Sequence, residues 1–405
     1  MAAGKAKPTD QIMTEPFEGC YPCFGGNGIR GYVDEYNQDG IFSIVGRQGA
    51  LCGNINIAKG KFYATEHAVV TTLFSGIDFN WSNYVLEALQ LNSYATGAAQ
   101  PGLSVANVLN VFVPVPPTQE QVHIGIRIAE SIKIIENIED EKENLQTLIS
   151  SAKSKILDLA IRGQLVPQNP NDEPASVLLE RIRAEKEELI KAGKIKRDKK
   201  ESIIFRGEDN SYYEKFSDGK CHCIDNELPF ELPDGWEWCN LSMIGTTNIG
   251  LTYRPADIEP DGTIVLRSSN IVNDEIDLND LVRVKTKIRE NQYVQPNDIL
   301  ICARNGSKAL VGKCALVNNL KEPTSFGAFM AIYRTNYNKY VIHYLHTSLF
   351  RSVFNAGNST AINQLTQDML KKALIPFPPI LEQEKIVNVV SKLFIHLHGI
   401  EKSLN

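Results

Sequence analysis

Apolar and polar residues alternate in two different ways along this chain, and the change of period marks its organisation. Residues 1–117 contain short runs of β-branched and aromatic residues between turns rich in Gly and Asn, which is typical of strands. Residues 81–91 keep their apolar side chains on one side and predict a short helix. The strands predicted in this part are residues 41–45, 68–73 and 111–115.

The pattern becomes helical at residue 118. Thr118 followed by Gln121 predicts a capping box, and Gly163 is expected to end the helix. The apolar positions have the 3-4 spacing of a left-handed coiled coil, with Lys142 as one polar seam residue, and the rod should be about 65 Å long. The seam consists of Ile135, Ile138, Lys142, Leu145, Ile149, Ala152, Ile156 and Leu159.

A further helix is predicted over residues 174–200, beginning at Pro174. Its end, residues 191–200, carries a run of Lys and Arg that fits either a solvated helix end or a contact to a DNA backbone. Residues 201–227 are expected to be a loop, and residues 232–238 a turn followed by an aromatic strand.

The last part of the chain shows the mixed pattern again and closes with a second coil. A helix is predicted over residues 340–354. We expect the two coils to pair in antiparallel fashion, with residues 149–159 of the longer first coil left for a partner subunit, the helix at 174–194 or another copy to cover. The predicted strands are residues 263–267, 298–303, 312–317 and 329–333. The second coil contains Ile386, Val390, Leu393, Leu397, Ile400 and Leu404.

One phrase occurs twice in the chain. Residues 113–121 and 375–383 both carry Pro-Pro-x-x-Glu-Gln between a strand-like and a helical segment. Residues 44–50 match residues 301–307, where an apolar strand is followed by Arg, an amide side chain and Gly. A long unit that appears twice predicts two related modules.

The two copies differ at their starts. Ser104 and Thr366 are N-cap candidates of a short helix before each proline phrase, but the Trp236-containing segment 232–238 has no counterpart near Met1. The repeat predicts an α+β fold of two β-rich modules with helical spacers that form an antiparallel coiled coil. The predicted domains are residues 1–117 (shortened at its N-terminus), 118–200 (central helical spacer), 201–379 and 380–405 (short C-terminal spacer).

Composition narrows the class of protein. The chain has 405 residues, 43% of them hydrophobic and 22% charged, which is ordinary for a soluble globular protein of two or three domains. No apolar run is long enough to cross a bilayer and the N-terminus lacks an apolar signal core, so a cytoplasmic protein is expected, without membrane contact. The net charge of −6 argues against a protein that coats DNA unaided, but leaves a local basic face open.

Eight cysteines are too few for a disulfide framework in a chain of this length. Cys20 with Cys23, and Cys221 with Cys223, could hold a metal ion or form a redox pair, or could be ordinary reduced thiols. The two pairs lie far apart in sequence and in different modules, which favours reduced thiols.

The chain resembles the specificity subunit of Type I restriction–modification enzymes. The resemblance covers nearly the whole sequence. Its motifs are residues 21–32 (YPCFGGNGIRGY), 46–50 (GRQGA), both proline phrases, 156–165 (ILDLAIRGQL) and 232–238 (LPDGWEW).

This resemblance implies two target-recognition domains, each reading one half of a split double-stranded DNA site, with spacers that fix their separation. It implies partners that methylate adenine with S-adenosylmethionine, and restriction subunits that translocate and cleave DNA with ATP and Mg²⁺. The chain itself would be non-catalytic and without cofactor. Consistently, the chain has no G-x-x-x-x-G-K-[ST] motif.

Base reading needs side chains that reach base edges, and Arg and Asn or Gln are suited to guanine and adenine. Residues beside glycines at the ends of strands can satisfy this need. An arginine at such a position could equally pair with a local carboxylate. Turn formation alone would explain Asn27. Three basic residues, Arg254, Lys308 and Lys313, are expected to contact phosphates. The candidate base readers are Asn27, Arg30, Tyr32, Arg47, Gln48, Ser268, Ser269, Asn270, Arg304, Asn305 and Ser307.

Departures from the family pattern leave an alternative open. The shortened first module and the short terminal coil fit a truncated or silent fragment that binds modification subunits without reading DNA. A catalytic fusion and a purely scaffolding coiled-coil protein are weaker alternatives, because the first lacks its motifs and the second leaves two β-rich modules unexplained.

Overall fold

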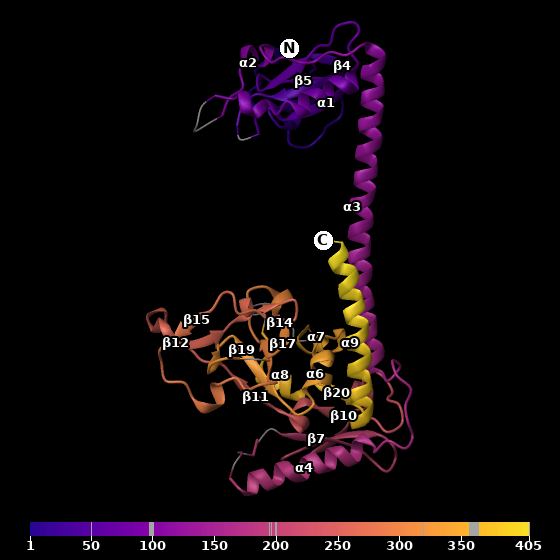
Figure 1. The fold of residues 1–405 in the computed structure, drawn as a ribbon, viewed down its shortest axis with the longest axis vertical. Coiled ribbons are helices and arrows are strands. Elements are labelled where there is room, and N and C mark those ends of the chain that lie inside the picture. Colours follow the sequence, from indigo (N-terminus) through magenta and orange to yellow (C-terminus); the bar gives the residue numbers. More distant parts are fainter. Residues whose placement is uncertain are drawn as a thin grey trace. The chain divides into compact units, whose positions relative to one another are not determined.

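The computed structural model describes residues 1–49, 51–96, 101–193, 195, 197–198, 201–318, 320–355 and 364–404. The chain divides into two compact units, Met1–Glu141 and Lys142–Asn405, which are described separately below. Each contains a β-rich module, and the long helix α3 (Thr118–Ile161) belongs in part to each unit (Figure 1). The expected α+β class and the internal repeat are confirmed.

The first unit is built on one mixed sheet. Its strands lie in the order β1-β6-β4-β5-β2-β3, and all neighbours are antiparallel except β2 and β5. Phe24, Ile44 and Phe62 form its core, and Ser43 on β4 donates a 2.9 Å hydrogen bond to Asn83 on the covering helix α1. The bounds are β1 Ala2–Ala3, β2 Tyr21–Gly25, β3 Gly28–Val33, β4 Gln38–Gly46, β5 Ile55–Ala64, β6 Ala68–Thr71, α1 Phe79–Ala88 and α2 Val105–Leu109.

The second unit distributes the same strand order over two sheets. One has the order β11-β19-β16-β17 and the other β15-β12-β18, with β12 and β18 parallel. Its bounds are β10 Glu237–Asn240, α5 Leu241–Ile244, β11 Thr246–Ile249, β12 Ile258–Leu266, β13 Ile271–Val272, β14 Glu275–Ile276, β15 Val282–Val284, β16 Ile299–Cys302, β17 Cys314–Leu316, β18 Thr324–Phe326, β19 Met330–Arg334, α6 Asn338–Leu345, α7 Ser348–Asn355, α8 Gln367–Lys372 and β20 Leu374–Phe377.

The strand pairings show which elements of the two modules correspond. β4 pairs with β6 as β16 pairs with β19, and β1 lies beside β6 as β11 lies beside β19. Gly4 and Gly250 occupy the same place, because a Cβ on either would meet a backbone carbonyl oxygen at 2.1 and 2.2 Å. The repeat is therefore present in the structure as well as in the amino-acid sequence.

The two helical coils pair within the second unit. Helix α9 (Ile380–Ser403) runs antiparallel to the last turns of α3, with Lys153 Nζ 2.9 Å from the Glu401 carboxylate (Figure 1). Ile386 and Val390 of α9 share one core with Leu157.

The uncovered part of the first coil was predicted wrongly. Ile149 and Leu157, expected to be left over, are buried, whereas Ile135 and Ile138 are exposed. The expected antiparallel pairing itself places the start of α9 beside the end of α3, so the terminal coil covers the end of the first coil and leaves its earlier part bare. Gly163, with φ of +67°, ends α3 as expected.

Residues 111–115, predicted to be a strand, form none. The matching β20 pairs with β10, and no described residue of the first unit takes the place of β10 beside residues 111–115. A lone extended segment leaves its backbone groups to water, so the predicted strand does not form.

Three further expectations were wrong. Residues 201–227 form the antiparallel sheet β7 (Ser202–Arg206), β8 (Tyr212–Phe216) and β9 (Cys221–Cys223) instead of a loop. The helix predicted over 340–354 is broken between α6 and α7 by Thr347, whose hydroxyl donates to Tyr344 O and accepts from Phe350 N. Gln121 makes no capping box, because it bonds to the loop before α1 and to Pro116 O.

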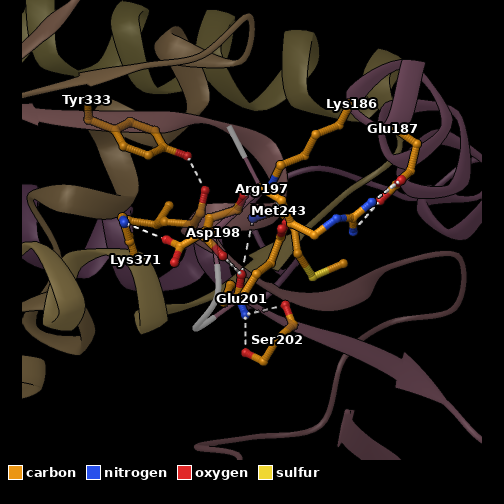
Figure 2. A network of polar contacts seen from close by, with 12 residues as sticks. Lys186, Glu187, Arg197, Asp198, Glu201, Ser202, Met243, Tyr333 and Lys371 are labelled. Carbon is orange, nitrogen blue, oxygen red and sulfur yellow. Dashed lines mark hydrogen bonds and ion pairs between the residues drawn. The ribbon is translucent and has the colours of Figure 1, made fainter. Parts of the chain in front are cut away.

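Helix α4 (Ala175–Lys191) begins after Pro174 as predicted, but it ends at Lys191 instead of continuing to residue 200. It packs within the second unit through Leu178 and Leu179. Figure 2 shows the polar contacts at its end. Arg197 Nη1 lies 2.9 Å from the Glu187 carboxylate, and Lys371 Nζ lies 2.6 Å from Asp198.

These intramolecular pairs favour a structural role for the described part of the basic run. Lys194, Lys196, Lys199 and Lys200 of that run lie outside the described residues. No helix in the described ranges combines the length and apolar character needed to cross a membrane.

Candidate nucleic-acid interface

In the second unit, the predicted base reader Arg304 lies just after β16. Its backbone N donates to Phe329 O at 3.0 Å, and its exposed guanidinium is 5.5 Å from the centroid of the Phe329 ring. An aromatic ring under a guanidinium restrains the side chain while leaving its N–H groups free to donate. Arg304 is therefore held at the surface in a position to bind an acceptor.

The loop after β16 meets the loop after β12. Asn305 Nδ2 donates to Ser268 Oγ at 3.3 Å, and Asn305 Oδ1 accepts from Ser307 N at 3.0 Å. Ser269, the next residue in the β12 loop, is exposed. The structure thus brings together Ser268, Ser269, Arg304, Asn305 and Ser307, which the sequence placed in two separate segments.

Asn270 does not belong to this surface. It is fully buried, its Oδ1 accepts from Arg267 N, and its Nδ2 donates to Asp277 O and Asp280 O at 3.0 and 2.8 Å. Because these bonds fix the loop and the amide has no route to a base edge, the prediction for Asn270 is wrong.

A groove of about 630 Å³ opens beside the two loops. Ser268 and Ser269 line it together with Tyr253 and Phe329, two aromatic residues that sequence reasoning did not select. Arg267 also lines the groove. Its Nη2 lies 2.8 Å from Asp280, while its buried Nε has no hydrogen-bond partner among the described residues. The sequence does not predict these two aromatic residues as part of the site, because they lie far from the Arg-amide-Gly phrase in the chain.

The three predicted phosphate contacts lie around this region. Arg254 and Lys308 are exposed, and Lys313 is half-buried in the segment that pairs with Cys302. No ion pair within 4 Å joins Lys308 to an acidic side chain of the described ranges. Burial raises the pKa of the neighbouring Cys302 thiol, which disfavours its thiolate form.

The first unit has a corresponding surface at the end of β4, built from different residues. We call this surface, around Arg47 and Gln48, and the one around Arg304 and Asn305 the two edges. Arg47 N donates to His67 O at 2.9 Å, and Gln48 is exposed opposite Gly102. Asn27, in the turn after β2, accepts a 2.7 Å hydrogen bond from Asn54, a residue that the sequence did not single out. A Cβ on Gly26 would lie 3.2 Å from Gln48 O, so these two loops also touch.

Arg30 and Tyr32 lie further along β3. Arg30 donates to Thr9 Oγ1 at 2.8 Å, and the half-buried Tyr32 pairs through its backbone with Met13. Both residues therefore lie on β3 and not in the loop that carries Gln48.

The register of the two edges corrects the sequence match. Leu103 N donates to Arg47 O as Leu365 N donates to Ala303 O. Gln48 bridges to Gly102 as Arg304 bridges to Gln364. The structure therefore pairs Arg47 with Ala303 and Gln48 with Arg304, one residue away from the match of Arg47 with Arg304. Ala50, at the end of the matched phrase, lies outside the described residues.

Among the described residues, no group of three or more His, Cys, Asp or Glu side chains is arranged to hold a metal ion. The two edges instead present amide, hydroxyl and guanidinium groups, which hydrogen-bond to bases and phosphates.

Comparison with known proteins gives a consistent result. The sequence model of the family described as Type I restriction modification DNA specificity domain matches residues 3–147 and 233–405. The EcoprrI specificity subunit of Escherichia coli is 42% identical over 160 residues, covering 39% of this chain and 40% of that protein. The EcoAI specificity subunit of Escherichia coli is 28% identical over 335 residues, covering 69% of this chain and 53% of that protein. The chain thus spans about half the length of the curated relatives it matches, or less.

Two solved structures share the fold. One, described as the structural basis underlying complex assembly and conformational transition of the type I R-M system, has a TM-score of 0.58 at 15% identity and covers 100% of this chain and 90% of that one. The HsdS subunit from Thermoanaerobacter tengcongensis has a TM-score of 0.50 at 13% identity, covering 100% of this chain and 88% of that one.

Proposed function

The chain belongs to the family of Type I restriction–modification DNA specificity domains, and on that premise we propose that it is the DNA-recognition subunit of a Type I complex. Residues 1–117 and 201–379 act as target-recognition domains, and each reads one half of a bipartite double-stranded site. The helical segments 118–200 and 380–405 dock adenine-N6 methyltransferase subunits and restriction subunits. The chain acts in the cytoplasm, and catalysis and its cofactors belong to those partners.

One observation carries this proposal. Gln48 and Arg304 stand at equivalent backbone positions of the two modules, each at a strand end. Gln and Arg are the side chains that pair with adenine and guanine through two hydrogen bonds. Two modules with the same backbone arrangement but a different base-reading side chain at one position support two half-sites of different sequence.

The proposal is tested by titrating the full chain, alone and with candidate methyltransferase subunits, into DNA duplexes. One duplex carries the bipartite motif identified by mapping adenine methylation in cells that carry this chain, and the other carries a scrambled version of it. We expect tighter binding to the motif by a factor of about 10³ or more with the partners present. Equal affinity for both duplexes would contradict it.

A silent fragment that binds methyltransferase subunits without reading DNA is the second candidate. It is favoured by residues 111–115, for which the described residues provide no strand partner of the kind that β20 has in β10. The same titration separates the two, because the silent fragment would bind the methyltransferase subunits yet add no sequence preference.

A further inference from the structure

The groove beside Phe329 is formed by three segments of the second unit. Residues 251–258 lead from β11 into β12, residues 267–269 follow β12, and residues 327–329 join β18 to β19. Backbone bonds tie the segments together, because Leu251 N donates to Phe326 O at 2.7 Å and Gly327 N donates to Leu266 O at 2.9 Å. At about 630 Å³ the groove has the volume of a site for a small molecule.

The lining of the groove is mostly apolar, and two of its residues are aromatic. Leu251, Pro255 and Ile258 supply aliphatic surface, and Tyr253 and Phe329 supply rings. Phe329 is 61% exposed, yet its backbone is held, because its carbonyl oxygen accepts from Ala303 N at 2.9 Å and from Arg304 N at 3.0 Å. Exposed rings on a fixed backbone offer flat apolar faces to a planar ligand.

The charges at the groove fit a ligand with a neutral body and an anionic tail. Arg267 lines the groove, but its charge is balanced by the Asp280 carboxylate 2.8 Å from its Nη2, so the interior suits a phosphate poorly. Two exposed cations lie next to the lining residues. Arg254 stands between Tyr253 and Pro255, and the Arg304 guanidinium lies 5.5 Å from the centroid of the Phe329 ring. A nucleotide has this distribution of charge, with an uncharged base and a phosphate.

Hydroxyl groups complete the lining. Ser268 and Ser269 both line the groove, and Ser269 is exposed. Ser268 Oγ accepts from Asn305 Nδ2 at 3.3 Å, which leaves its own proton available to donate. Hydroxyls both donate and accept, so they can bond to the polar edge of a base whose faces lie on the rings.

We propose that this groove binds one unpaired nucleobase of DNA, stacked on Tyr253 and Phe329 with its polar edge on Ser268 and Ser269. The proposal rests on the proposed DNA-binding function of this module. A base inside a duplex cannot bind in this way, because its neighbours in the stack cover both of its faces. A methyltransferase that flips its target adenine out of the helix leaves the opposite thymine unpaired, and this thymine is the expected occupant.

The binding test compares three dye-labelled short duplexes with the full chain by fluorescence anisotropy at one salt concentration. One duplex is fully paired, one carries a single unpaired thymine, and one carries an abasic site at the same place. The abasic duplex controls for the greater flexibility of an interrupted helix. We expect the duplex with the unpaired thymine to bind roughly tenfold more tightly than the abasic one, because a base stacked on aromatic side chains contributes that much.

Substitutions in the groove should remove this difference. Tyr253→Leu and Phe329→Leu each take away a ring, and we expect the thymine and abasic duplexes to bind them with nearly equal affinity. Tyr253→Phe keeps the ring and should keep most of the difference. Tyr213→Leu makes the same change on β8, outside the groove, and should leave the difference intact.

A cross-linking test locates the base on the unsubstituted chain. Replacing the unpaired thymine with 5-iodouracil allows irradiation to link the base to an aromatic side chain that it touches. We expect the link at Tyr253 or Phe329, identified by mass spectrometry of the digested protein.

Four results would overturn the proposal. Equal affinity of the parent chain for the thymine and abasic duplexes would do so while leaving sequence reading of paired DNA intact. A cross-link outside the groove would place the base elsewhere. Free thymidine monophosphate that bound as tightly as the unpaired-thymine duplex would make the groove a mononucleotide site. No binding to any duplex would contradict the proposed function as well.

Discussion

Trp236 Nε1 donates a 3.0 Å hydrogen bond to the Glu382 carboxylate, and both side chains are buried. The bond joins the segment before β10 to the first turn of α9, so it ties the start of the second module to the helix that follows it. Burial raises the pKa of Glu382, and the hydrogen bonds from Trp236 and Gln168 oppose this rise by stabilising the carboxylate.

Removing the indole N–H should therefore destabilise the chain. Trp236→Phe leaves one carboxylate oxygen of Glu382 without its donor, and we expect the unfolding free energy to fall by about 1–3 kcal/mol beyond the loss of volume. Trp238→Phe removes the same volume from the neighbouring buried position and serves as the control. Urea denaturation measures both, and equal losses for the two variants would show that the hydrogen bond contributes nothing.

Arg304→Ala should weaken DNA binding at one half-site only. We expect a loss of about 1–3 kcal/mol on the matched duplex and little change on a duplex altered at that half-site. Arg127→Ala, at an exposed position of α3, is the control. Equal losses on matched and scrambled duplexes would rule out base reading by Arg304.

Lys308→Ala should act differently, because a phosphate contact carries no sequence information. We expect weaker binding to every duplex and a slope of log K against log salt that is shallower by about 1. Lys220→Ala, in the exposed turn between β8 and β9, provides a matched loss of one positive charge. A loss restricted to the matched duplex would contradict the role given to Lys308.

The burial of the two coils predicts unequal responses to substitution. Ile386→Ala, in the core that α9 shares with α3, should cost about 2–5 kcal/mol of unfolding free energy. Ile138→Ala, on the exposed part of α3, should change it by less than about 0.5 kcal/mol. Denaturant titration of both variants decides this, and a large cost at Ile138 would show that the residue is covered in solution.

Stability should also depend on pH through α6. Burial, with a smaller contribution from His346, lowers the pKa of His343 from 6.5 to about 4. The unfolded chain then binds this proton more readily, so stability is complete above pH 6.5 and falls by up to about 3 kcal/mol as the pH drops towards 4. His343→Gln should flatten this part of the profile. Parallel profiles for the parent and the variant would refute the assignment.

Periodicity and repeated phrases located most elements. The strands around β4, β6, β16 and β19 and the helix caps at Ser104 and Thr366 followed from local sequence, and the antiparallel direction of the coils followed from the internal repeat. The β7–β8–β9 sheet was missed although Asn210 and Gly219, both with positive φ, lie in its two turns. The apolar residues of this segment show no clear strand pattern in the sequence, because their burial depends on a distant contact, that of Tyr212 with Trp238.

The candidate site could be predicted only in part. The position of the two edges followed from glycines at strand ends, but their register did not. Arg47 and Arg304 each precede an amide residue, and only the backbone pairing shows that Gln48 is the counterpart of Arg304. Burial of Asn270 and the aromatic groove at Tyr253 and Phe329 depend on tertiary packing, which a single sequence does not encode locally.

The most direct test of the central claim maps adenine methylation across the genome of cells that carry this chain with its methyltransferase partner. We predict one bipartite methylated motif with two specified halves. Gln48→Ala should relax one half, and Arg304→Ala the other. Absence of a methylated motif, or a motif in which both substitutions relax the same half, would contradict the account.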